Sequence, residues 1–484
     1  MDLYKKYAKD IGLVSIANII VLLKGFILLP ILTKSLDVEL YGTFALIMVT
    51  ISLLAPLCTL ELGFAVIRFL GAETDKAKIS KGVSSIIAVT ALISFAMSSL
   101  IFVFAQQLAL TIFGGIEATF YIQISAFLIF LNAMDQIMLS YFRAVQQIKK
   151  YATILILIVF GEITLTAYLV LSGYGLVGVI ISFLIIRTTI IVIEFLWIKS
   201  QIKFVTPNLS IVKSYLPFSL PILPAALCYW LINLGDRYVI GYFMGASAVG
   251  VYSASYSLGA VLALFYAPIP IALFPAITHL YMNNKIQELK MHLKYSLRYF
   301  LMFAIPAFFG LSILSKSILT ILTTSEFVEG FMIISIIALA TILFNCIAIN
   351  NMVLTLFKET KKSAAIYAIS AAINIILNVL FVPMFGIIGA AIATLITFII
   401  HLIMISKISF KLMPYDIDFK FMIKCIIAAG IMAYIIFIFN SYLYANIIFS
   451  VFIATIIYFS ILIVSGGFTR EEFEFLKSIL RSMF

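Results

Sequence analysis

The chain has 484 residues, of which 64% are hydrophobic and only 11% are charged, and it carries a net charge of +11. Soluble globular domains carry roughly 25% charged residues, so this composition excludes a soluble enzyme or binding domain surrounded by water. Most of the outer surface is therefore expected to face lipid. The composition and the repeated apolar runs predict an all-α, polytopic membrane protein.

Because a bilayer core of roughly 30 Å needs about 20 apolar residues per helix, apolar runs of that length indicate membrane spans. The first run directly follows Lys5, Lys6 and Lys9 and is expected to be a retained helix rather than a secretory signal. In chain order the fourteen predicted spans are residues 11–33, 43–67, 82–105, 118–141, 152–172, 175–198, 215–241, 250–275, 299–322, 331–357, 363–383, 387–406, 421–440 and 443–465. The tail, residues 468–484, has one apolar and one charged helical face, which is typical of a helix lying on the membrane surface.

The Lys and Arg residues predict the orientation of the spans. If the N-terminus is cytoplasmic, 27 of the 32 basic residues lie in cytoplasmic segments, and the outer loops hold only Lys34 and Lys316. Positive residues resist translocation across the membrane, so both termini are expected to be cytoplasmic. The same rule accounts for the net positive charge, and a nucleic-acid partner is not expected.

Three short patterns recur in the same order, with offsets of about 210 residues. Residues 40–44 match 248–252, residues 149–150 match 361–362, and residues 175–178 match 386–389. Each repeat holds six spans, so the two repeats enter the membrane with the same orientation. Parallel repeats of this kind are typical of transporters whose substrate binds where two lobes meet. We expect an N-lobe at 1–205, a C-lobe at 206–415, and two further spans with the amphipathic tail at 416–484.

A series of motifs lies at residues 18–25, 29–34, 41–44, 60–63, 68–69, 219–221, 230–237, 249–253 and 274–275. Together they resemble the polysaccharide-transporter family of oligosaccharide flippases, which are similar to O-antigen flippases. The resemblance runs from about residue 5 to about residue 410. It implies membership of the multidrug/oligosaccharidyl-lipid/polysaccharide exporter superfamily. It also implies two six-helix lobes in a V around a central cavity, and transport of a lipid-linked oligosaccharide.

Three cations are predicted to lie within spans, namely Lys24, Arg187 and Arg237. Ionisable groups inside a bilayer are costly and are functional by default. Guanidinium and ammonium groups bind phosphate oxygens directly, so these residues are candidates for receiving a polyprenyl-diphosphate head group. The alternative is that they form buried structural ion pairs, with partners drawn from Glu61, Asp135, Glu162, Glu194 and Asp236.

The carboxylates allow a coupling hypothesis. Glu61, Asp135, Glu162 and Asp236 are candidates for taking up H⁺ or Na⁺ during transport, although a salt bridge to a nearby cation explains each of them equally well. The sequence has no Gly-Lys dipeptide and hence no Walker A phosphate loop. The scattered Cys and His residues predict no metal site, and no cofactor is expected.

These observations favour a flippase that moves a lipid-linked oligosaccharide from the cytoplasmic to the outer leaflet of the plasma or inner membrane by alternating access. Glycan polymerases or glycosyltransferases are candidate partners. A rival is an ion-coupled multidrug extruder of the same superfamily. A second rival is a membrane-embedded glycan polymerase or glycosyltransferase, whose best support is the D-x-D pattern of Asp416 and Asp418. That pattern lies in a short charged loop where solubility also explains it.

Overall fold

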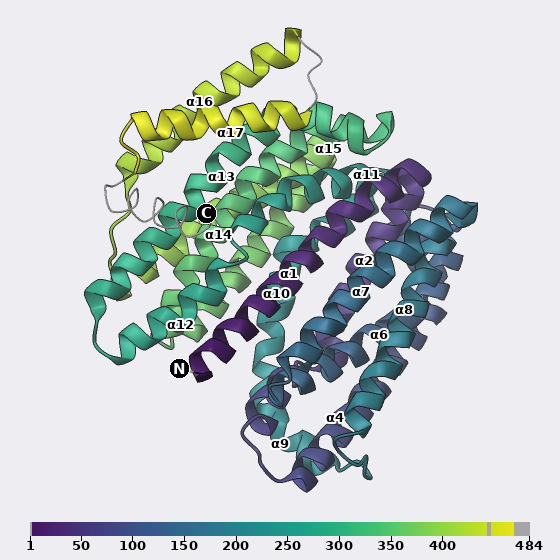
Figure 1. The fold of residues 1–484 in the computed structure, drawn as a ribbon. Helices are drawn as coiled ribbons and strands as arrows, with labels where there is room; N and C mark the ends of the chain where they lie inside the picture. Colours follow the sequence, from purple (N-terminus) through teal and green to yellow (C-terminus); the bar gives the residue numbers. More distant parts are fainter. Residues whose placement is uncertain (1, 443–446, 469–484) are drawn as a thin grey trace. The chain divides into compact units, whose positions relative to one another are not determined.

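The computed structural model describes residues 2–442 and 447–468, and within those ranges every regular element is a helix (Figure 1). The predicted all-α polytopic membrane fold is confirmed. The predicted surface helix of the C-terminal tail falls almost entirely at 469–484, outside the described residues. The α-helices are α1 (Asp2–Ser35), α2 (Val38–Thr59), α3 (Leu62–Ala65), α4 (Lys76–Val103), α5 (Ala105–Leu108), α6 (Ala118–Ala144), α7 (Ile148–Leu169), α8 (Gly175–Lys199), α9 (Leu209–Ser219), α10 (Leu223–Leu234), α11 (Asp236–Gly259), α12 (Ile269–Met282), α13 (Ile286–Leu322), α14 (Phe331–Leu356), α15 (Thr360–Leu412), α16 (Phe419–Tyr442) and α17 (Ile447–Val464).

Six short π- or 3₁₀-helical segments join or extend these helices. They are η1 (Val66–Leu70), η2 (Ala109–Phe113), η3 (Val170–Tyr174), η4 (Leu220–Ile222), η5 (Ala260–Phe265) and η6 (Ser325–Gly330). Pro221 explains why the chain adopts a 3₁₀ turn at η4, because proline has no backbone N–H to donate to the hydrogen bonds of an α-helix.

Eleven helical stretches in the described residues are long and apolar enough to cross a membrane. Two of them are double spans, divided at glycines with non-helical backbone: η3 separates α7 from α8 at Gly173, and Gly386 divides α15. With the shorter apolar helix Phe449–Val464 the number of spans becomes fourteen. A third glycine, Gly245, divides α11 between the seventh and eighth predicted spans. Glycine fits these turns because it has no Cβ atom, so a positive φ causes no steric clash.

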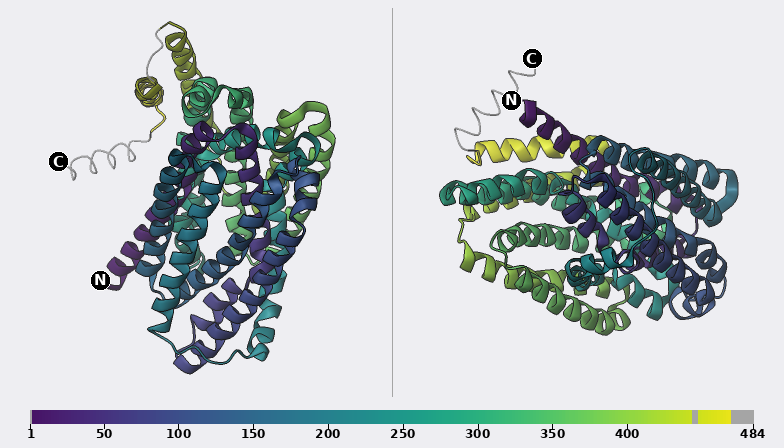
Figure 2. Two further views of the ribbon diagram at one scale, coloured as in Figure 1. Left: turned by 90° about the vertical axis from the view of Figure 1, so that its right-hand side faces the viewer. Right: turned by 90° about the horizontal axis from the view of Figure 1, so that it is seen from below.

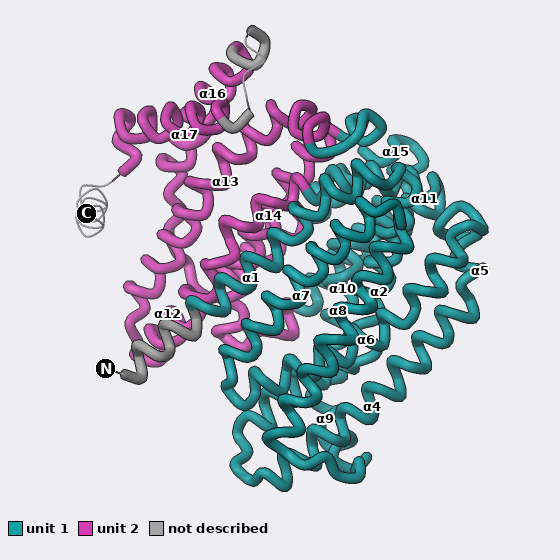
Figure 3. The backbone as a smooth tube through the Cα atoms, turned by 45° about the vertical axis from the view of Figure 1, so that its right-hand side comes forward, with its two compact units in different colours: residues 1–257, 322–330, 364–397 teal, residues 258–321, 331–363, 398–484 magenta. Residues whose placement is uncertain are grey.

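The described residues form two compact units, coloured separately in Figure 3. Unit 1 comprises residues 1–257, 322–330 and 364–397; unit 2 comprises 258–321, 331–363 and 398–484. Within unit 1, α6 packs along α4 and α8, and α1 packs along α7. In the left view of Figure 2 the long purple-to-blue helices of this unit run lengthwise beside one another.

Two repeat-related glycines meet inside unit 1. Gly42 on α2 and Gly250 on α11 occupy matching positions of the internal repeat. A Cβ on Gly42 would lie 1.8 Å from the carbonyl oxygen of Ala246, and one on Gly250 would lie 2.3 Å from that of Val38. Two helices approach this closely only where the residues at the point of contact have no side chain on either helix. The two glycines therefore fix the crossing of α2 and α11.

Within unit 2, a buried arginine ties the last two spans to the repeat. Arg298 on α13 donates to the Asp418 carboxylate at 2.7 Å and to the carbonyl oxygen of Gly467, just after α17, at 2.7 Å. Asp418 also caps α16 by accepting from the backbone N–H of Phe421 at 3.0 Å. These contacts explain Asp418 structurally, which removes the main support for a D-x-D metal site at Asp416 and Asp418.

Replacing Asp418 with alanine is expected to lower the free energy of unfolding by about 3 kcal/mol, because it leaves the buried Arg298 without its carboxylate. Asp416 is exposed, and Asp416→Ala is expected to change stability by no more than about 0.5 kcal/mol. Thermal unfolding of the purified variants in detergent measures both effects. Equal damage from the two substitutions would contradict the structural role and revive the D-x-D interpretation.

Candidate functional site: a buried ion-pair network in unit 1

The site is built where α1, α6, α7 and α8 pack together. On α8, residues at intervals of three or four form a single helical face, and that face is buried against α6. Phe183, Ile190 and Ile198 supply its apolar part. Arg187 and Glu194 share the face at a spacing of seven residues. The helix thus carries a cation and an acid into an otherwise apolar interior.

Four charged groups from four helices meet at this face. Lys24 on α1 donates to Glu162 on α7. Arg187 donates through Nε to the other oxygen of Glu162 at 2.8 Å and through a terminal nitrogen to Asp135 on α6 at 2.5 Å. The Lys24 ammonium also lies 4.7 Å from the centre of the Phe183 ring, a cation–π contact. The structure therefore forms three of the ion pairs that the sequence left open.

The network is layered. The side chains of Lys24 and Arg187 each keep 18% of their surface exposed, whereas Glu162 is fully buried and the Asp135 side chain is 6% exposed. The cations form the accessible layer and the acids lie beneath them. An anion that reached this surface would therefore meet the positive groups first.

A fifth charged residue, Glu194, lies beside Asp135. Glu194 is fully buried, and no donor group in the described part of the chain hydrogen-bonds to either of its carboxyl oxygens; its side chain lies within hydrogen-bonding range of the Asp135 carboxyl. Oδ1 of Asp135 also lacks a partner. Sequence reasoning treated Glu194 only as a potential ion-pair partner. Its seven-residue spacing from Arg187, which puts both side chains on one face of α8, is the signal that could have placed it in the same network.

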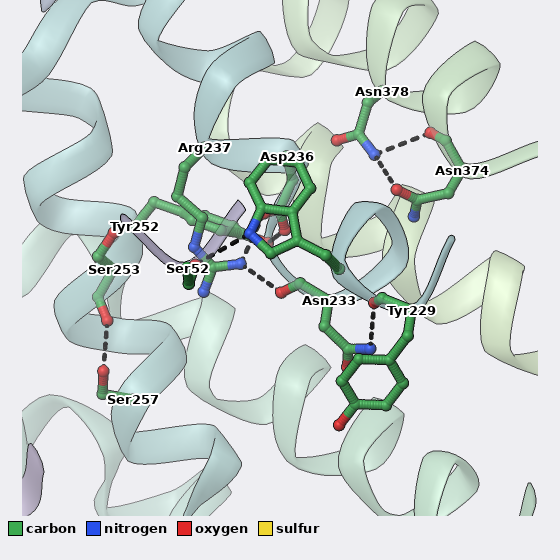
Figure 4. Close-up of polar contacts among 11 residues, drawn as sticks. Ser52, Tyr229, Asn233, Asp236, Arg237, Tyr252, Ser253, Ser257, Asn374 and Asn378 are labelled. Carbon is green, nitrogen blue, oxygen red and sulfur yellow. Dashed lines mark hydrogen bonds and ion pairs between the residues drawn. The ribbon is translucent and has the colours of Figure 1, made fainter. Parts of the chain in front are cut away.

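Arg237 and Asp236 form a separate buried pair at the start of α11 (Figure 4). Arg237 donates to Asp236 at 2.6 Å and to the carbonyl oxygen of Asn233 at 2.7 Å, and its guanidinium lies 3.9 Å from the centre of the Tyr256 ring. The second oxygen of Asp236 accepts from the Tyr252 hydroxyl. The Arg237 side chain is only 5% exposed. These contacts support the structural-pair alternative for this arginine.

Asn374 and Asn378, on α15, are drawn in the same view (Figure 4). The side-chain amide of Asn378 donates to the carbonyl oxygen and to the side-chain oxygen of Asn374, at 2.8 and 3.1 Å. Asn374 in turn donates to Thr397 at 3.3 Å. Hydrogen-bonded polar side chains thus run along this stretch of α15, where the side-chain oxygen of Asn378 accepts no hydrogen bond from the described residues.

Glu61 takes part in neither cluster and lies at the break between α2 and α3. Leu60 and Glu61 have left-handed backbone, with φ of 48° and 54°. Such conformations are costly for non-glycine residues and gather at functional sites and switch regions. Glu61 lines a cavity of about 240 Å³ together with Ser140, Arg143 and Tyr151.

The structure therefore brings together Lys24, Arg187, Asp135 and Glu162 from the predicted set. It places Asp236 with Arg237 elsewhere in unit 1, and Glu61 by itself at a helix break. Among the described residues no group of three or more His, Cys, Asp or Glu side chains is arranged to hold a metal ion.

Residues 31–331 match the polysaccharide biosynthesis protein family, and residues 232–463 match the lipid II flippase MurJ family. Among curated proteins, the chain is 28% identical to the probable low-salt glycan biosynthesis flippase Agl15 of Haloferax volcanii over 228 residues, 47% of this chain and 48% of that protein. It is 30% identical to the probable flippase AglR of the same organism over 177 residues, 35% of this chain and 37% of that protein. The chain thus spans about half or less of these relatives.

Solved structures show the same fold over most of the chain. The lipid II flippase MurJ in an inward closed conformation gives a TM-score of 0.77 at 19% identity, covering 92% of this chain and 97% of that one. A multidrug resistance transporter of the MATE family, in an inward-facing conformation, gives 0.65 at 14% identity, with coverage of 82% and 95%. At these identities the likeness shows the fold alone.

Proposed function

Because this chain belongs to the polysaccharide biosynthesis protein family, we propose that it is a flippase for a lipid-linked oligosaccharide carried on a polyprenyl diphosphate. It is a multi-pass membrane protein, and its proposed role is transport rather than catalysis. Of the two similar curated proteins, one is named as a probable low-salt glycan biosynthesis flippase and the other as a probable flippase. Transfer from the cytoplasmic to the outer leaflet would serve the export of cell-surface glycans.

The observation that carries the proposal is the layering of the ion-pair network. A lipid-linked diphosphate must bring negative charge into the membrane, where its lost hydration has to be replaced. Lys24 and Arg187 offer cationic side chains that are partly exposed and lie within membrane-spanning helices, where they are held by the buried acids Glu162 and Asp135. Guanidinium and ammonium groups bind phosphate oxygens strongly. We assign the head-group contact to these two residues first and to the enclosed Arg237 last.

The proposed transport mechanism is alternating access by the two lobes. The N-lobe at 1–205 and the C-lobe at 206–415 would alternate in opening to the two sides of the plasma or inner membrane, with both termini cytoplasmic. Asp135, Glu162, Asp236 and Glu61 are the acids available for coupling to H⁺ or Na⁺. Partner enzymes would be the glycosyltransferases or polymerases that supply or consume the lipid-linked glycan.

The test is translocation in liposomes. Full-length protein is reconstituted with a fluorescent polyprenyl-diphosphate oligosaccharide, and the fraction in the outer leaflet is followed with a quencher that does not cross the membrane. Wild-type protein is expected to exchange the lipid between leaflets, whereas Lys24→Ala is expected to slow the exchange at least tenfold, the effect of losing about 1.4 kcal/mol of head-group binding. The control is Lys34→Ala, which removes an exposed lysine from the last turn of the same helix.

Unchanged exchange by Lys24→Ala, at normal protein abundance, would contradict the head-group assignment. No exchange by the wild-type protein, together with uptake of organic cations under an ion gradient, would contradict the flippase proposal itself. That result would place the chain functionally with the multidrug extruders that share its fold.

A further inference from the structure

The charges buried in the network do not balance. Two cations, Lys24 and Arg187, face three acids, Asp135, Glu162 and Glu194. The first two acids accept hydrogen bonds from the cations, but Glu194 accepts none and is fully buried. An ionised carboxylate in that position would be neither paired nor solvated. A buried charge without a partner is among the costliest features that a fold can contain.

A proton shared between two carboxyls removes this imbalance. Glu194 lies beside Asp135, and Oδ1 of Asp135 is one of the buried oxygens without a hydrogen-bond partner. A protonated Glu194 would donate its O–H to that oxygen, which would satisfy both groups at once. Two neighbouring carboxyls commonly hold one proton between them for this reason. The network would then be neutral, with two cations and two carboxylates.

The groups that face the pair come from each of the helices around it. Asp135 belongs to α6, and Arg187 lies two turns from Glu194 on α8 itself. Glu162 of α7 forms the next layer by accepting a hydrogen bond from Arg187, and Lys24 of α1 donates to Glu162. Arg187, Glu162 and Lys24 therefore set the charge that the pair experiences.

We propose that Asp135 and Glu194 form a proton-binding pair, which holds one proton while Arg187 is paired with Asp135 and takes up a second proton when a diphosphate takes Arg187 away. This inference rests on the proposed function for its second step only. The diphosphate and the carboxylates compete for the same two cations. A carboxylate that loses its cation inside the membrane is neutralised by a proton from water. Head-group binding would thereby be linked to proton uptake.

The first step is tested without any substrate. Infrared spectra of the purified protein are expected to contain a C=O band of a protonated carboxylic acid near neutral pH. Labelling of the glutamates with ¹³C at the side-chain carboxyl should shift this band, and Glu194→Gln should remove it. Glutamine has nearly the same shape and keeps a donor towards Asp135, so this variant is expected to fold. Glu39→Gln, which changes an exposed carboxylate on α2, is the control. If the band is absent from the wild-type spectrum, or survives Glu194→Gln, the shared proton is overturned.

The second step is tested with farnesyl diphosphate as the probe. Calorimetric titration in buffers of different ionisation enthalpy gives the number of protons taken up per bound diphosphate. For each farnesyl diphosphate bound, the wild-type protein is expected to take up about one proton more than the double variant Asp135→Asn/Glu194→Gln. If both proteins bind the probe and take up the same number of protons, the linkage between head-group binding and proton uptake is overturned and the proposed function is left intact. A failure of the wild-type protein to bind the probe would count against the head-group site instead, and the infrared result would still decide the resting proton.

Discussion

Replacing Arg187 with methionine is expected to lower the free energy of unfolding by about 3–5 kcal/mol and to abolish lipid translocation. The substitution leaves Asp135 without a cation and Glu162 with only Lys24, and both acids are buried. Breaking a buried pair by removing one partner leaves an uncompensated charge inside the protein, which is the source of the cost. Thermal unfolding in detergent and the liposome assay measure the two effects separately.

A second substitution separates the structural from the functional role of the arginine. In Arg187→Met/Asp135→Asn the carboxylate left unpaired is also removed, while Lys24 still pairs with Glu162. We expect this double variant to regain most of the lost stability, because both members of a buried pair can be replaced at little cost. Translocation is expected to stay absent, because the guanidinium that binds the diphosphate is still missing. Recovery of both properties would mean that Arg187 serves only to neutralise Asp135.

Gly42→Ala is expected to destabilise the protein by about 1–3 kcal/mol or more, the usual range for forcing atoms into a closely packed contact. The added methyl group would lie 1.8 Å from the carbonyl oxygen of Ala246, a backbone atom that can move only if α2 and α11 separate. Gly250→Ala should have a similar effect, because its Cβ would lie 2.3 Å from the carbonyl oxygen of Val38. Protein abundance in membranes and the thermal unfolding midpoint are the measurements.

Gly310→Ala is the matched control for the glycine pair. Gly310 is also inside a long helix, α13, but apart from the adjoining residues of its own helix no atom lies within 4 Å of the position that an added methyl group would take there. Alanine is favoured over glycine in a helix by up to about 1 kcal/mol, so this variant should be as stable as the wild type or slightly more so. If Gly42→Ala behaved like Gly310→Ala, the close crossing of α2 and α11 would be wrong.

The sequence by itself determined the class of fold, the number of spans and most of their boundaries. Bilayer thickness limits the length of each apolar run along the chain, so a one-dimensional pattern carries that information. The turn glycines illustrate it: Gly173 and Gly386 fall at or beside the predicted span boundaries, where the structure has non-helical backbone. Lys24 and Arg187 were likewise identifiable from the sequence, because a charge within an apolar run is conspicuous.

Only the tertiary structure decided which groups meet. Lys24 and Glu162 are 138 residues apart, and each could have faced several partners until the rotation and packing of α1, α6, α7 and α8 were fixed. The same packing buried Glu194 without a donor and enclosed Arg237 between Asp236 and two tyrosines. Hydropathy measures how apolar a segment is and carries no information about helix rotation. The pairing of charges, and with it the chemistry of the site, is therefore a property of the folded chain.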